Sequence, residues 1–144
     1  VPFLVRYPGK ATADQCRDSL QTLVDLAPTF LNFCDIDVPN SMTGKDQSQV
    51  WQGEKESVRD HIICENRHEP DTVHVKTYVD DRYKITVYYN EKYGELFDMK
   101  EDPNESNNLW DDPDYQELKK ELLLKFMWAE MGKEPIWMPR IAGA

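Results

Sequence analysis

The segment Glu65-Asn66-Arg67-His68 carries the residue types best suited to contact an anionic substrate. It follows a short apolar run, so the sequence predicts that it lies at the end of a strand and on a loop. Arg67 offers a planar fork of donors that can hold an anionic group through two hydrogen bonds, and His68 can donate one near neutral pH. We take these four residues as the candidate substrate-binding residues. The alternative is a solvated loop in which Arg67 pairs with Glu69.

The sequence gives less support to a metal centre or to catalysis within this chain. A calcium loop of the EF-hand type that begins at Asp98 fails, because its third position is Lys100 and its sixth is Pro103. A zinc site would need ligands on one face, but strand alternation separates its four candidates, His61, Cys64, His68 and His74. No nucleophile, base and orienting group can be assembled, so we predict no catalytic residue and no metal ligand here.

Composition limits the remaining function classes. The 144 residues suffice for one compact domain, and 17 basic against 27 acidic residues give a formal net charge of −10. Such a charge repels a phosphate backbone, so nucleic acid is not an expected partner. No run approaches the roughly 20 apolar residues that span a bilayer, so we expect no membrane partner. The three cysteines have no CxxC spacing and are interpreted as small buried apolar residues, which leaves the compartment open: Cys16, Cys34 and Cys64.

The first part of the chain predicts a strand, a helix and a long connection. Val1 to Tyr7 is an apolar run typical of a buried strand, and its abrupt start is typical of the middle of a larger protein. A helix is expected from Asp25, as its cap, to Asp35, with an apolar stripe of Leu26, Phe30 and Cys34. Residues 37–60 are polar and predict a surface connection with one helical turn around Trp51.

The second part predicts an antiparallel meander closed by a helix. A short strand at residues 61–65 precedes two alternating runs around Asp80-Asp81, which predict a β-hairpin. Another strand follows at residues 94–98, then a turn containing Asp102-Pro103. Asp112 and Pro113 predict a capped helix start, and the apolar spacing continues to a stop at Gly132. The predicted fold class is α+β, a small antiparallel sheet of about four strands packed by a C-terminal helix.

The order of these motifs resembles the C-terminal third of the sulfatase family, which has an alkaline-phosphatase-like α/β fold. VPFLVRYPG at the start is similar to the strand after the family's active-site lysine segment, and LVDLAPTFL at residues 23–31 is similar to its VDLAPTLL helix. Residues 44–53 take the place of the family's Gly-Arg-Ser-Leu loop, although the sequence Lys45-Asp46-Gln47-Ser48 departs from that motif. RYKI at residues 82–85 and GELFD at residues 94–98, followed by DPNESNNL, resemble its RYKYI and ELYDL segments.

This resemblance implies that the catalytic groups and this chain belong to different parts of a larger enzyme. The family uses a formylglycine, made from Cys or Ser in a Cys/Ser-x-Pro-x-Arg segment, beside a divalent cation, calcium. No cysteine or serine of this chain fits that pattern, so the resemblance places the nucleophile and metal in an N-terminal sulfatase domain upstream of Val1. The expected parts are the end of that N-terminal domain, a connecting loop, an α+β subdomain and an extended tail, at residues 1–36, 37–60, 61–134 and 135–144.

The implied function is hydrolysis of a small-molecule or carbohydrate sulfate ester, to which this chain contributes scaffold and pocket rim. Its expected partner is the N-terminal sulfatase domain. Residues 1–35 are expected to expose apolar surface without that domain, so the separated chain is expected to be inactive and either poorly stable or self-associating. The resemblance allows a periplasmic, secreted or cytoplasmic location. Two other functions remain open, a phosphonate or phosphodiester hydrolase of the same superfamily and a non-catalytic acidic module that binds a protein partner.

Overall fold

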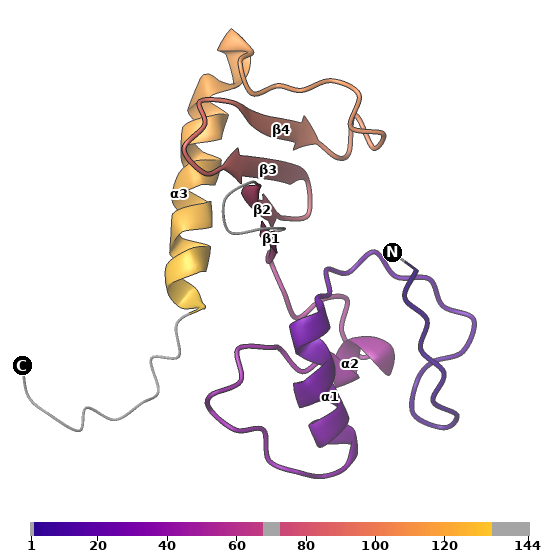
Figure 1. Cartoon of the computed structure of the whole chain (residues 1–144). Helices are drawn as coiled ribbons and strands as arrows, with labels where there is room; N and C mark the ends of the chain where they lie inside the picture. The colour runs from indigo at the N-terminus through magenta and orange to yellow at the C-terminus, as the bar shows by residue number, and fades with distance from the viewer. Residues whose placement is uncertain (1, 68–72, 134–144) are drawn as a thin grey trace, which may run out of the picture. The chain divides into compact units, whose positions relative to one another are not determined.

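The computed structural model describes residues 2–67 and 73–133, and these form two compact units that divide after Asp60 (Figure 1). The first unit holds the short helices α1, Leu26–Phe33, and α2, Ser48–Trp51. The second, His61–Gly132, holds a four-stranded sheet and the long helix α3, Gln116–Gly132. The predicted tail at residues 135–144 lies outside the described residues. None of the helices in the described ranges has the run of apolar side chains needed to span a bilayer.

The sheet of the second unit is the predicted antiparallel meander. Its strands are paired in chain order: β1, Ile62–Arg67; β2, His74–Val79; β3, Tyr83–Tyr88; and β4, Gly94–Asp98. The register pairs Ile63 with Tyr78, and Ile85 with both Tyr78 and Leu96. Directly opposite residues share a face, so these four side chains form one apolar row across the sheet.

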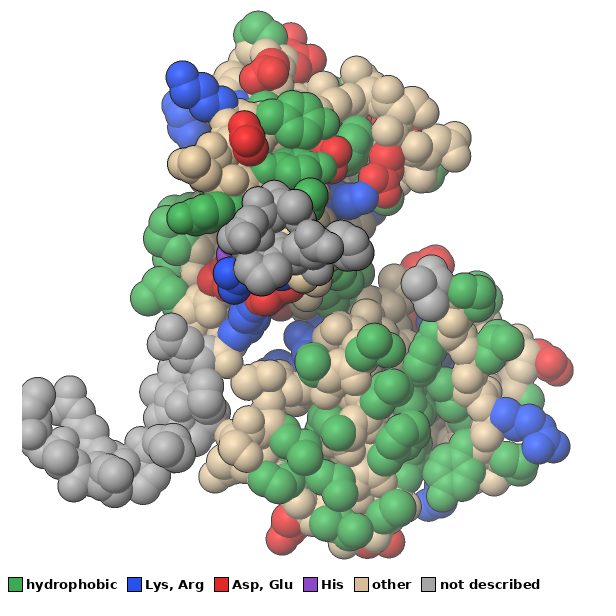
Figure 2. All heavy atoms as spheres, viewed as in Figure 1, with side chains coloured by type: hydrophobic (Ala, Val, Ile, Leu, Met, Phe, Trp, Pro, Cys, Tyr) green, Lys and Arg blue, Asp and Glu red, His purple; other side chains and the backbone are tan. Residues whose placement is uncertain are grey.

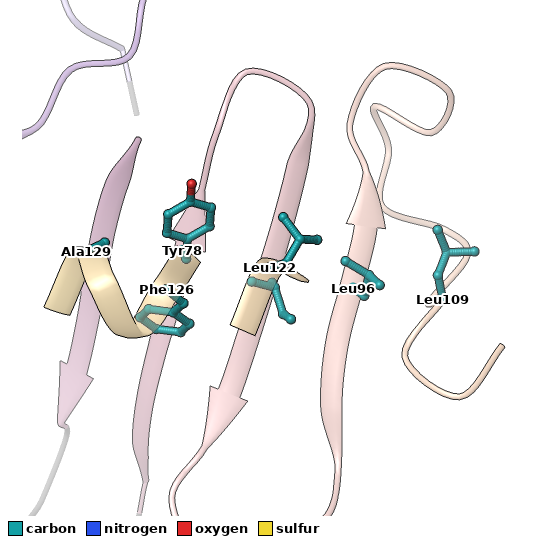
Figure 3. Packing of buried hydrophobic residues seen from close by; sticks show 7 residues of the cluster. Tyr78, Leu96, Leu109, Leu122, Phe126 and Ala129 are labelled. Atoms are coloured by element: carbon teal, nitrogen blue, oxygen red, sulfur yellow. The ribbon is translucent and has the colours of Figure 1, made fainter. Parts of the chain in front are cut away.

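Helix α3 covers that row and completes the core. Leu122, Phe126 and Ala129 recur along one side of the helix, and all three are buried, as helical spacing predicts. Figure 3 shows them facing Tyr78 and Leu96, and the rings of Phe126 and Tyr78 lie 5.9 Å apart. A fully buried side chain of the size of Leu122 or Phe126 stabilises the fold by about 1.5–3 kcal/mol, and the methyl group of Ala129 contributes less. The predicted α+β class, with a C-terminal helix on a four-stranded sheet, is confirmed.

The joint between β4 and α3 is fixed by side chains that replace strand hydrogen bonds. Asn108 accepts hydrogen bonds from the amides of Leu96 and Trp110, both at 3.0 Å, and donates one to the carbonyl of Gly94. The ring of Trp110 lies against Gly94 so closely that a Cβ there would come within 2.5 Å of it. Asp112 caps the helix start as predicted, since its carboxylate accepts the Asp114 amide at 2.9 Å.

Two acidic residues, Asp98 and Glu105, hold the turn of this joint. Asp98 accepts hydrogen bonds from the amides of Lys100 and Glu101, and the Glu105 side chain pairs with Lys84 on β3. Glu105 also takes the left-handed backbone conformation, with φ of 55°.

The first unit departs further from its predictions. Residues 2–7 form no strand and are exposed, because no strand of the described chain pairs with them. Helix α1 is present, but its predicted apolar stripe is wrong, since Phe30 and Cys34 are exposed while Pro28 and Thr29 are buried. The helical turn near Trp51 is confirmed as α2. It is not a surface feature, because Val50 and Trp51 are buried.

The cysteine prediction is also wrong. All three thiols are exposed: Cys16, Cys34 and Cys64. Cys34 follows the end of α1, and Cys64 pairs with Thr77 on the sheet face that α3 does not cover. The helix that buries the other face therefore gives Cys64 no cover.

Candidate functional site

The predicted substrate-binding segment lies mostly on a strand rather than on a loop. Strand β1 continues through Arg67, so Glu65, Asn66 and Arg67 are strand residues with exposed side chains. His68 lies outside the described residues. The pairing with β2 supplies the backbone hydrogen bonds that extend the strand beyond its apolar start.

The register separates these residues between the two faces of the sheet. Glu65 pairs with Lys76 and Arg67 pairs with His74, so these four side chains project on the α3 face. Asn66 pairs with Val75 and projects on the opposite face. The structure therefore brings Glu65 and Arg67 together with two residues of β2, and it places Asn66 away from them.

Lys76 links this segment to α3. Its Nζ lies 2.5 Å from a carboxylate oxygen of Glu130 and 3.4 Å from one of Glu65. The hydrogen bond to Glu130 is the main cause that raises the pKa of the Lys76 ammonium above its ordinary value, and it outweighs the opposing effect of burial. Lys76 is therefore protonated throughout the physiological range and held between the two carboxylates.

A cavity of about 380 Å³ opens beside this ion pair, between the sheet and α3. Its apolar walls include Val87 of β3 and Leu123, Phe126 and Met127 of α3. Its polar groups come from His74, Lys76, Tyr89 and Glu130. The rings of His74 and Tyr89 lie 5.5 Å apart, and 75% of Tyr89 is exposed. The volume is that of a small-ligand site.

A second charged cluster, in the first unit, is buried and saturated. Asp25 is 1% exposed, and its carboxylate accepts the Lys45 amide at 2.7 Å and a paired contact from the Arg59 guanidinium. Gln47 and the Thr22 amide supply two more hydrogen bonds. Burial raises the pKa of Asp25, but these hydrogen bonds, led by that from Arg59, outweigh it and lower the pKa.

This saturation decides the role of Asp25. A carboxylate whose oxygens already accept this set of hydrogen bonds has little capacity left to bind a ligand or to take a proton. Asp25 was predicted as the cap of α1, and it does precede that helix, but its side chain instead joins residues 20 to 34 positions away. We interpret the cluster as structural.

The described residues do not fit the formylglycine and metal that the sulfatase resemblance implies. In residues 2–67 and 73–133, no group of three or more His, Cys, Asp or Glu side chains is arranged to hold a metal ion. No cysteine or serine of the sequence stands in a Cys/Ser-x-Pro-x-Arg segment. We therefore derive no catalytic step from this chain.

Sequence reasoning did not single out His74, Lys76, Tyr89 or Glu130 as site residues. The alternation along residues 73–78 did place His74 and Lys76 on one face, but Val73, Val75 and Thr77 gave the other face the more apolar character. The pairing with Glu130 joins residues 54 positions apart. No local pattern reports such a contact.

Comparisons with known proteins agree with this fold. A family model described as N-sulphoglucosamine sulphohydrolase, C-terminal, matches residues 1–131. An N-acetylglucosamine-6-O-sulfatase of Bacteroides thetaiotaomicron is 31% identical over an alignment of 130 residues, and the match covers 85% of this chain and 23% of that protein. A Delta 4,5-hexuronate-2-O-sulfatase of the same bacterium is 32% identical over an alignment of 123 residues, and the match covers 82% of this chain and 26% of that protein.

Solved structures show the same architecture. A protein in complex with its substrate D-glucosamine-2-N,6-O-disulfate matches with a TM-score of 0.69 and 24% identity, over 82% of this chain and 25% of that one. A phosphonate monoester hydrolase from Silicibacter pomeroyi matches with a TM-score of 0.67 and 20% identity, over 78% and 25%. At these identities the likeness shows the fold alone. The chain spans about a quarter of the length of the curated relatives above. It belongs to the family of sulfatase C-terminal regions that the N-sulphoglucosamine sulphohydrolase model describes.

Proposed function

We propose that this chain works as the C-terminal part of a sulfatase that hydrolyses sulfate esters of carbohydrates. The family match over residues 1–131 carries the proposal. Two sulfatases that are 31% and 32% identical to the chain are named for sulfated sugars, which supports a carbohydrate substrate. We infer from the resemblance that a formylglycine and a calcium ion lie in the part of the protein that precedes this chain. The formylglycine would supply the attack on sulfur, and the calcium ion would stabilise the charge that develops.

The second unit would contribute to the rim of the substrate pocket. We retain Glu65, Asn66, Arg67 and His68 as proposed substrate-binding residues, and the exposed Arg67 is the strongest of them. A guanidinium holds a sulfate group through two charge-assisted hydrogen bonds, which a single ammonium does not match. Glu65 would act differently, as an acceptor for sugar hydroxyls.

The first unit would dock against the preceding part of the sulfatase, and residues 1–36 would belong to that larger domain. Large apolar side chains are exposed on the first unit, where Figure 2 shows many hydrophobic side chains at the surface. They include Phe3, Leu4, Leu23, Val24, Phe30 and Ile36. Such a concentration marks an interaction surface rather than a solvated one. These residues share an origin in the first 36 positions, which supports the preceding domain as the partner.

Sulfate release by the complete protein tests the proposal. We expect release from 6-O-sulfated N-acetylglucosamine to exceed hydrolysis of an aryl phosphonate monoester at equal concentration. Arg67→Ala should raise KM by about tenfold, because a hydrogen bond to a charged group contributes about 1.5–3 kcal/mol. Lys92→Ala is the control, an exposed cation on the loop after β3, and it should leave KM unchanged.

Three results would contradict this proposal in different ways. Preference for the phosphonate would favour the superfamily alternative, with which the chain shares its fold. No hydrolysis of either ester would favour the acidic binding module. An unchanged KM in Arg67→Ala would remove Arg67 from the substrate contacts while leaving the assigned activity intact.

A further inference from the structure

The cavity between the sheet and α3 combines an apolar wall with a polar rim. Val87, Leu123 and Phe126 form part of the wall, while Lys76 and Glu130 meet at its edge. A sugar ring has the complementary character, since its C–H faces are apolar and its hydroxyls lie around its edge. The exposed ring of Tyr89, beside His74, adds a flat surface of the kind on which such a face packs.

The rim is also organised to receive hydroxyl groups. Lys76 is fixed between Glu65 and Glu130, so a donor and two acceptors stand in set positions beside the cavity. The side chain of Lys76 is 32% exposed and that of Glu130 is 26% exposed, so both keep access to solvent. Vicinal hydroxyls can donate to the carboxylates and accept from the ammonium without moving either group.

The charges next to this rim favour an anionic substituent. Lys76 is balanced by its two carboxylates, but none of the described residues forms an ion pair with Arg67. The register places Arg67 directly across from His74, at the end of the sheet where His74 lines the cavity. A carboxylate or sulfate on the sugar would meet this guanidinium while its ring lies over Tyr89.

We propose that the cavity is a subsite for a second, acidic sugar residue, held by Arg67, His74, Lys76, Tyr89 and Glu130. This inference rests on the proposed function, which supplies the class of ligand. It adds that the sulfatase contacts two neighbouring sugars of its substrate rather than one. The subsite accounts for three features together, the volume of about 380 Å³, the exposed tyrosine and the fixed lysine.

Calorimetric titration of the complete protein tests the subsite without any turnover. The probe is an unsulfated disaccharide of glucuronic acid and N-acetylglucosamine, which offers a carboxylate and no sulfate ester. We expect saturable binding with a Kd below about 10 mM. Tyr89→Ala should weaken it about fivefold through loss of ring packing, and Lys76→Met about tenfold through loss of a charged donor.

Matched variants separate this site from general surface effects. Tyr93→Ala removes another exposed tyrosine of the same unit, and Lys100→Met removes a lysine that also pairs with a carboxylate, Asp81. Both should bind the probe as the unsubstituted protein does. Circular dichroism of each variant shows whether its fold is retained.

The outcomes for the subsite and for the proposed activity are distinct. Sulfate release without saturable probe binding overturns the subsite and leaves the sulfatase assignment standing. Binding that Tyr89→Ala and Lys76→Met reduce no more than the control variants do also overturns the subsite. Selective loss of binding supports the subsite even where sulfate release is not observed, in which case the activity assignment fails alone.

Discussion

The two units of this chain differ in the balance between the apolar and the polar side chains that they bury. The second unit has a continuous apolar core between its sheet and α3, with Ile85, Leu96 and Leu122 fully buried. The first unit buries Val50 and Trp51 beside the polar residues Asp25, Thr29, Gln47 and Ser48, and it exposes Leu4 to 94% and Leu23 to 80%. A hydrophobic core stabilises a unit by itself, whereas a charged cluster contributes little beyond what its desolvation costs.

This difference teaches which part depends on a partner. We expect the second unit to fold by its own core, and the first to hold its shape through the Asp25 cluster until apolar contacts cover its surface. The 144-residue chain therefore should not unfold as one cooperative body. The following changes test that expectation, from the largest effect to the smallest.

Asp25→Ala should be the most damaging substitution, and only to the first unit. It leaves the Arg59 guanidinium, which is 11% exposed, without its buried partner, at a cost of about 3–5 kcal/mol. Hydrogen exchange measures the outcome residue by residue. The amide of Val50 should lose protection while that of Leu96 keeps it. Equal loss at both amides would show that the units unfold together.

Leu122→Ala reverses the pattern. It opens a cavity in the core of the second unit and should cost about 3 kcal/mol there. Protection of Leu96 should fall and that of Val50 should remain. Leu124→Ala is the matched control, because Leu124 lies on the same helix and is 45% exposed. A comparable loss in the control would contradict the assigned core.

Acid should weaken both units at their buried carboxylates. Hydrogen bonds from Arg82 lower the pKa of Asp98 against the opposing effect of burial, and the pKa of Asp25 is also lowered. A lowered pKa in the folded state gives stability that is complete above the unfolded value of about 4 and is lost as the pH falls through the folded value. Urea unfolding between pH 6 and pH 2 measures this loss. Asp25→Asn should flatten it in the first unit only.

Leu4→Lys with Leu23→Lys should change stability least, by less than about 0.5 kcal/mol, because both side chains are already exposed. The separated chain should self-associate through its apolar surface, and sedimentation velocity should show that the double variant associates less. In the complete protein the same double variant should reduce the yield of folded enzyme. Unchanged yield would argue against docking through these residues.

Local patterns predicted the second unit well. The hairpin follows from alternation around Asp80-Asp81, and the helix start follows from Asp112-Pro113, because both depend on neighbours in the sequence. The first unit was predicted poorly. The spacing of Leu26, Phe30 and Cys34 indicated a buried stripe, but the contacts that orient α1 come from Lys45, Gln47 and Arg59.

The candidate site shows the same limit. The sequence indicated Glu65 and Arg67 by residue type, and the structure places both on one face with His74 and Lys76. It did not indicate the role of Glu130, because α3 brings that carboxylate to the sheet from 54 positions away. Long-range packing, rather than residue type, determines which side chains meet.

The hydrogen bonds of Asn108 have a consequence for the solubility of the sheet. A strand at the border of a sheet presents unpaired amides and carbonyls that can template the addition of a strand from another molecule. On β4 three of these groups, around Gly94 and Leu96, are already occupied. The Asn108 side chain takes the Leu96 amide and the Gly94 carbonyl, and the Leu109 amide binds the Leu96 carbonyl at 2.8 Å. Asn108 and the Leu109 backbone therefore leave fewer free groups on this edge for a strand from another molecule to pair with.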